Sequence, residues 1–124
     1  FNFRFSTESS EKSLKKEFES MLKELKLNYD LVWDLNGNPY YTKDNFFKDI
    51  VANSIKEITG YSPEQNAKGG TSDGRFVAKM NTEIVELGPV NQSIHQIDEH
   101  VKISDLWTLK DIYTKILKNL NQAF

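Results

Sequence analysis

The first six residues place the strongest constraint on the fold, because three phenylalanines alternate there with polar residues as Phe-Asn-Phe-Arg-Phe-Ser. Alternation with a period of two is typical of a strand that buries one face. A strand with three aromatic side chains on one face requires partners in a sheet. The sequence therefore predicts a strand at residues 1–6, lying either at the edge of a domain or inside a longer chain of which this is a fragment.

The segments that follow complete a predicted β-α-β unit over residues 1–42. Ser10 is a candidate N-cap, and apolar residues recur after it at helical spacing, so we predict a helix from about Ser10 to Lys26. Residues 29–35 alternate again and predict a second strand. The sequence Asn-Gly-Asn-Pro at residues 36–39 predicts the turn that ends it.

A second set of elements begins near Lys43, where we expect a boundary between two parts of the chain. The apolar pattern predicts a helix from Phe46 that Gly60 ends as a C-cap. Three more elements are expected: a short helix over residues 76–80, a short buried strand over residues 82–87, and a final helix capped by Ser104. This mixture of strands and helices predicts an α/β (α+β) fold.

Composition removes several classes of function. The chain has 124 residues and a net charge of −2, whereas phosphate binding requires a basic surface, so nucleic acid is not an expected partner. No run of about 18 apolar residues occurs, so we expect no membrane span, and no segment has the pattern of a signal peptide. The absence of cysteine excludes disulfides and thiol catalysis. A cytoplasmic location is the default expectation.

Two irregular segments, residues 68–75 and 88–101, are where we expect function, because binding residues gather in long loops. With a sheet between them, both loops would lie at the same end of it, where pockets of α/β folds form. In the first loop, Gly69-Gly70 permits positive φ and close approach of a ligand, and Arg75 is a candidate partner for a carboxylate. A structural turn in which Asp73 caps the next helix explains the same loop without a ligand.

The second loop contains both histidines of the chain, His95 and His100. Zinc requires three or four protein ligands, and the HExxH pattern is missing here. A single loop histidine is more often a hydrogen-bonded surface residue than a metal ligand. Arg4, on the polar face of the predicted first strand, is likewise most simply interpreted as a solvated side chain. The residues alone indicate a carboxylate or metal pocket that is incomplete.

Three motifs in these loops resemble a known family. They are GGTSDGRF at residues 69–76, VELGPVN at residues 85–91 and SIHQIDE at residues 93–99. Together they are similar to the C-terminal signature of bacterial succinyl-diaminopimelate desuccinylases. Those enzymes belong to the co-catalytic zinc family that also contains aminoacylases, acetylornithine deacetylase and glutamate carboxypeptidases. The opening FNFRFSTE and the WDLNGNPYYT stretch fit the same enzymes, so the resemblance covers essentially the whole chain.

The resemblance implies a two-domain enzyme with two zinc ions per subunit, cobalt being possible at one site. Residues 1–42 would form the last β-α-β of a lid that dimerises, and residues 43–124 the C-terminal part of the α/β catalytic domain. The implied reaction removes succinate from N-succinyl-LL-2,6-diaminopimelate, a small molecule of the lysine and diaminopimelate pathway, in a cytoplasmic homodimer. The other metal ligands and the general base would lie upstream of Phe1. The chain by itself would therefore be inactive.

The resemblance also assigns roles to individual residues. His95 matches a histidine that ligates one zinc ion, and we expect Glu99 to orient the loop around it. Arg4 and Arg75 match arginines that meet substrate carboxylates, a pairing that guanidinium groups favour. The positions that would line the substrate pocket are Gly70, Thr71 and Asn91. Asp98 stands where asparagine is common, and His100 lies at a variable position with no metal role.

Two other interpretations remain open at this point. The chain could be a non-catalytic dimerisation or binding module that descends from such an enzyme. It could also belong to a related aminoacylase, which the TSDGR motif at residues 71–75 disfavours.

Overall fold

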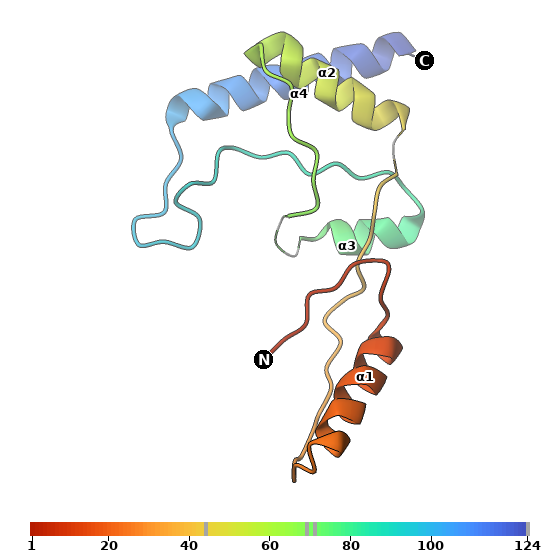
Figure 1. The fold of residues 1–124 in the computed structure, drawn as a ribbon. Coiled ribbons are helices and arrows are strands. Elements are labelled where there is room, and N and C mark those ends of the chain that lie inside the picture. The colour runs from red at the N-terminus through yellow and green to blue at the C-terminus, as the bar shows by residue number, and fades with distance from the viewer. Residues whose placement is uncertain (44, 69, 71, 124) are drawn as a thin grey trace. The chain divides into compact units, whose positions relative to one another are not determined.

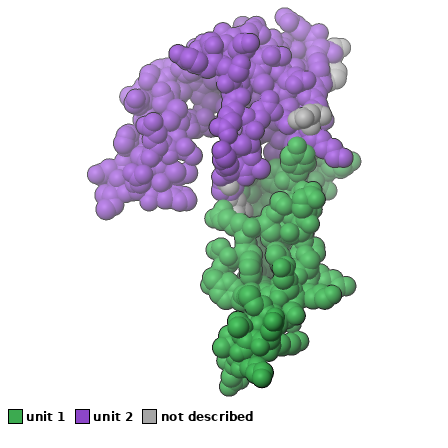
Figure 2. Space-filling view, in the orientation of Figure 1, with its two compact units in different colours: residues 1–41, 71–82 green, residues 42–70, 83–124 purple. Residues whose placement is uncertain are grey.

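The computed structural model describes residues 1–43, 45–68, 70 and 72–123. The described residues form five helical elements, shown in Figure 1: α1 (Glu11–Glu24), α2 (Phe46–Thr59), α3 (Gly74–Val77), the 3-10 helix η1 (Ala78–Met80) and α4 (Ile103–Ala123). They divide into two compact units, drawn in Figure 2. Unit 1 contains residues 1–41 and 71–82, and unit 2 contains residues 42–70 and 83–124.

Both helices predicted before residue 60 are confirmed, together with predicted signals at the start of the first and the end of the second. Ser10 caps α1 in a capping box, in which its side chain accepts from Ser13 N and the Ser13 side chain accepts from Ser10 N. The Asn45 side chain accepts from Lys48 N at the start of α2. Gly60 ends α2 at φ 80°, a left-handed conformation that glycine adopts without the strain of a Cβ.

Unit 1 is held together by aromatic rings packed on α1. The ring of Phe18 lies 5.0 Å from Phe1, 5.5 Å from Phe3 and 5.8 Å from Trp33, centroid to centroid. Trp33 Nε1 donates to Glu19 Oε1 at 3.0 Å. The segments that contain Phe1, Phe3 and Trp33 are thus fixed by side-chain packing against α1. The rings meet in edge-to-face and tilted geometries, which aromatic pairs favour.

Unit 2 is built on the packing of α2 against α4. The core of this pair is formed by Ile50, Val51, Ile112 and Ile116. Ser54 is completely buried between the helices, where its Oγ donates to Ile50 O at 2.7 Å and accepts from Asn119 Nδ2 at 3.0 Å. A buried hydroxyl requires such partners because its desolvation is otherwise uncompensated.

The prediction of an α/β fold is wrong for the described residues, which include no β-strand. The three segments predicted as strands, residues 1–6, 29–35 and 82–87, are irregular. In residues 82–87, side chains bond the backbone groups that a neighbouring strand would otherwise bond. Thr42 Oγ1 donates to Ile84 O at 2.7 Å and accepts from Ile84 N at 3.2 Å. Tyr113 OH donates to Leu87 O at 2.7 Å. Alternation identified chain segments with one apolar face, but a strand also requires a neighbouring backbone.

The predicted division near Lys43 stays a prediction. The two compact units are interleaved along the sequence, since residues 71–82 belong to unit 1 although they follow residues 42–70 of unit 2. The predicted sheet that was to bring the two candidate loops to one end is absent from the described part of the chain.

Candidate functional site

The segment that begins α3 is fixed by a small polar network in unit 1. Ser72 Oγ accepts from Gly74 N at 3.1 Å and lies 3.3 Å from Tyr40 OH. A Cβ on Gly74 would lie 3.0 Å from Tyr40 Cζ and closer still to its hydroxyl, so the tyrosine approaches the helix only because this residue is glycine. Asp73 occupies the N-cap position as predicted, but its side chain makes no cap hydrogen bond there. The hydroxyl of Ser72 bonds the first helical N–H instead.

Arg75 lies on α3 with its side chain half-buried in unit 1. Its Cζ is 4.7 Å from the centroid of the Phe76 ring. Its Cδ lies 3.1 Å from the position of a Cβ on Gly37, in the irregular segment that follows Trp33 along the chain. Arg75 Nε is buried and has no hydrogen-bond partner among the described residues. Pairing with a carboxylate, the role predicted for Arg75, would therefore involve the two Nη groups.

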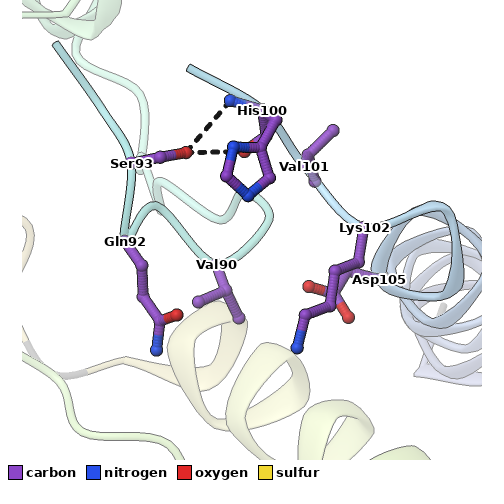
Figure 3. A pocket seen from close by; sticks show the side chains of 7 residues that line it. All are labelled: Val90, Gln92, Ser93, His100, Val101, Lys102 and Asp105. Atoms are coloured by element: carbon purple, nitrogen blue, oxygen red, sulfur yellow. Dashed lines mark hydrogen bonds between the residues drawn. The ribbon is translucent and has the colours of Figure 1, made fainter. Parts of the chain in front are cut away.

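The second candidate segment, residues 88–101 of unit 2, is named here the histidine loop. Ser93 closes it: its Oγ donates to His100 O at 2.8 Å and accepts from His100 N at 3.0 Å, as the dashed lines in Figure 3 show. Turn hydrogen bonds link Ile94 N to Asn91 O and Gln96 N to Ser93 O, each at 3.1 Å. Residues 91–100 thus form tight turns, and one serine joins positions 93 and 100 of the loop.

His95 lies near the tip of the histidine loop with its side chain exposed. Its backbone is left-handed at φ 61°, as is that of Asp98 at φ 62°. His95 N donates to Glu99 Oε2 at 3.4 Å, the outer limit for a hydrogen bond. The role of Glu99 in orienting the loop stays a prediction. The His95 ring has no hydrogen-bond partner among the described residues.

His100 differs from His95 in this respect. Its Nδ1 lies 2.7 Å from Asp98 O, and because a carbonyl only accepts, Nδ1 is the donor. The ring lines an open cleft of ≈ 210 Å³ in unit 2 (Figure 3). The cleft is bounded by Val90, Gln92, Ser93, His100, Val101, Lys102 and Asp105. His95 is not one of its lining residues.

The other predicted site residues are distributed between the units. Arg4 is exposed in the first segment of unit 1. Asn91 is exposed at the start of the turns of the histidine loop in unit 2. A Cβ on Gly70 would meet no described atom within 4 Å, and the expected approach of a ligand to this glycine stays a prediction. Thr71 and Gly69 lie outside the described residues.

The donor set fits a partial metal site. Among the residues that the structure describes, no group of three histidine, cysteine or acidic side chains could hold a metal ion. His95 nevertheless offers an exposed imidazole in a loop that Ser93 joins to His100, and an imidazole is chemically suited to be one ligand of a zinc ion. It would need two or three further donors.

Sequence reasoning missed the residues that support these side chains. Ser93 appeared only as one letter of a motif, Gly37 only in a predicted turn, and Tyr40 only in the WDLNGNPYYT stretch. Their contacts with His100, Arg75 and Ser72 join positions 7, 38 and 32 residues apart, and no periodicity in the sequence marks such pairs.

Comparison with known proteins identifies the family. The model of peptidase family M20/M25/M40 matches residues 5–119. The chain belongs to this family. Its members are metallohydrolases, so metal ions are part of the family's chemistry.

The similar proteins of known name agree with one another. The chain is 44% identical over 121 residues to a succinyl-diaminopimelate desuccinylase of Albidiferax ferrireducens, covering 98% of this chain. It is 47% and 48% identical, over 97% of its length, to proteins of the same name from Stutzerimonas stutzeri and Pseudomonas syringae. The chain spans 31–32% of the length of these relatives. In the described part of the chain, no helix is long and apolar enough to cross a membrane.

Proposed function

We propose that this chain is the C-terminal part of a zinc-dependent amide hydrolase that releases succinate from N-succinyl-LL-2,6-diaminopimelate. The observation that supports this proposal is the identity of 44–48%, over 97–98% of the chain, to relatives named for that reaction. The reaction consumes one water and yields succinate and a free amine. In this proposal the intact enzyme is a cytoplasmic homodimer, with residues 1–42 in its lid and residues 43–124 in its catalytic domain.

We assign His95 as the ligand that this chain contributes to one of two zinc ions, with cobalt possible at one of the sites. Bound zinc would supply Lewis acidity for hydrolysis of the amide. The exposed imidazole of His95 and the Ser93–His100 closure of its loop support this role. Because a zinc site requires three or four protein ligands, we expect the 124-residue chain alone to be inactive and to bind zinc weakly.

We assign the substrate's carboxylates to Arg75 and Arg4, and the wall of the substrate pocket to Gly70, Thr71 and Asn91. A guanidinium pairs with a carboxylate through two parallel hydrogen bonds, which suits a succinylated diamino acid with several carboxylates. Loss of such a charged contact costs about 1.5–3 kcal/mol, or roughly 10–100-fold in catalytic efficiency. Arg75→Ala and Arg4→Ala in the intact enzyme should show this loss and keep their zinc.

The test of the metal assignment compares three variants of the intact protein that contains this sequence. His95→Ala should lose or loosen one zinc ion, keep the other, and lose activity by orders of magnitude. Asp98→Ala is the matched control, because it places alanine at almost the same left-handed φ without removing an imidazole. His100→Ala tests the second histidine of the loop and should keep both zinc ions.

Zinc content and the kinetics of succinate release are measured side by side on these variants. If His100→Ala loses a zinc ion while His95→Ala keeps two, the metal assignment fails. If the wild-type intact protein, loaded with zinc, does not hydrolyse the succinylated substrate, the proposed function fails.

A further inference from the structure

The Arg75 side chain is held within unit 1 by contacts that its proposed binding of a substrate carboxylate does not explain. A half-buried arginine usually has partners for its N–H groups, because an unpaired buried donor costs free energy. Arg75 Nε is instead buried without a hydrogen-bond partner among the described residues. The side chain is therefore held by contacts of another kind.

Two such contacts are present. The guanidinium carbon lies 4.7 Å from the centroid of the Phe76 ring, well within the range of a cation–π interaction. Residues 36–39 are irregular and do not form the predicted turn. A Cβ at position 37 would lie 3.1 Å from Arg75 Cδ, 3.6 Å from Nη1 and 3.8 Å from Nε. Gly37 thus lets the arginine lie directly against the backbone of this segment, and a Cβ there would require the side chain to shift by a few tenths of an ångström.

The helix that bears Arg75 is also fixed by Tyr40, which lies in the same segment as Gly37. Tyr40 lies against Gly74 and its hydroxyl is 3.3 Å from Ser72 Oγ. The base of the arginine and the middle of its side chain are therefore both placed by residues 37–40. This is a built support, because it combines a close backbone approach, a ring contact and a polar anchor.

We propose that Gly37 and Phe76 are positioning residues for Arg75. They fix its guanidinium so that Nε is shielded and the two Nη groups, at the end of the side chain, face a carboxylate. The inference rests on the proposed function for the identity of the carboxylate, which is that of a succinylated substrate. The placement of the side chain itself depends only on the contacts within unit 1.

The placement is tested without activity, by NMR of the 124-residue chain labelled with ¹⁵N. Exchange of the Arg75 Nε–H with water should be slow in the wild type, because the atom is buried. Gly37→Ala and Phe76→Leu should each speed it by about tenfold or more, since one pushes the side chain away and the other removes the ring. Phe76→Tyr should restore slow exchange. Gly88→Ala is the matched control, because its Cβ meets no atom within 4 Å.

The use of the placement is tested in the intact zinc enzyme. The measurement is the ratio of catalytic efficiencies for the succinylated substrate and for an analogue whose succinyl carboxylate is a primary amide. Gly37→Ala and Phe76→Leu should lower this ratio by about 3–10-fold through KM, and neither should lower it further in an Arg75→Ala background. A purely structural defect would reduce both efficiencies equally and leave the ratio unchanged.

The outcomes separate the two proposals. Fast Nε–H exchange in the wild type, or exchange that neither substitution changes, overturns the inference. An unchanged ratio in Gly37→Ala and Phe76→Leu, where Arg75→Ala lowers it, also overturns it. Lack of hydrolysis by the intact wild-type enzyme overturns the proposed function, whereas slow exchange that both substitutions accelerate still supports the placement of Arg75.

Discussion

The α2–α4 pair and the histidine loop belong to the same unit and are stabilised in different ways. The helix pair excludes water from four apolar side chains and one serine. The histidine loop exposes nearly all its side chains and is closed by hydrogen bonds of Ser93. Apolar burial stabilises a structure far more than exposed hydrogen bonds do. Substitutions in the helix pair should therefore change stability, and those in the loop should mainly change function.

The largest effect on stability is expected from Ile112→Ala. Ile112 is 5% exposed in the core of the helix pair, and truncation of a buried isoleucine costs about 2–5 kcal/mol of the free energy of unfolding. Urea denaturation of the chain measures this value. Leu117→Ala is the control on the same helix, because Leu117 is 66% exposed and its loss should cost under about 0.5 kcal/mol. Equal losses in the two variants would mean that the helices do not pack through Ile112.

A smaller effect is expected from Ser54→Ala, which removes the acceptor of Asn119 Nδ2 inside the same pair. An amide left without a partner between helices costs about 1–3 kcal/mol. The control is the double variant Ser54→Ala/Asn119→Leu, which removes both partners and should lose less than the sum of the two single changes. Strict additivity in a urea double-mutant cycle would show that the two side chains are not coupled.

In the histidine loop, Ser93→Ala measures how much hydrogen bonds of a serine hydroxyl contribute to stability. It removes both hydrogen bonds that join Ser93 Oγ to His100, at an exposed position, so we expect a loss of about 0.5–1.5 kcal/mol. The effect should be local, and hydrogen exchange of the His100 amide should accelerate more than that of the amides in α4. Ser62→Ala, at an exposed position outside the loop, is the control. Uniform acceleration across unit 2 would indicate that the loop and the helices unfold together.

The same contrast explains which features could be predicted from the sequence. The limits of α1 and α2 follow from Ser10 and Gly60, whose effect is local, and the structure confirms both. The predicted strands failed because their pattern concerns one segment, whereas a ladder needs a second backbone. In residues 82–87 the groups that replace that backbone are the hydroxyls of Thr42 and Tyr113. No local signal identifies these partners.

The candidate site shows the same limit. Arg75, His95 and Glu99 were identified from motifs, and their chemical types were sufficient for that purpose. The residues that support them were not identified. The role of Gly37 depends on the side chain packed beside it, and the role of Ser93 depends on the loop residues that it bonds.

The smallest effect on stability is expected from Glu99→Ala, and it gives the sharpest contrast with Ile112. Glu99 is exposed, and its Oε2 accepts from His95 N at 3.4 Å, where water can replace it, so the free energy of unfolding should change by less than about 0.5 kcal/mol. In the intact enzyme, however, the contact orients the loop that bears the proposed zinc ligand. Loss of an orienting carboxylate typically lowers metal affinity or activity by about 10–100-fold.

Glu83→Ala, at an exposed carboxylate outside the loop, should change neither quantity. Zinc titration and urea denaturation of both variants check this expectation. If Glu99→Ala lowers stability as much as it lowers zinc affinity, the loop is a structural element of unit 2, and the separation of stability from function proposed for the two regions is wrong.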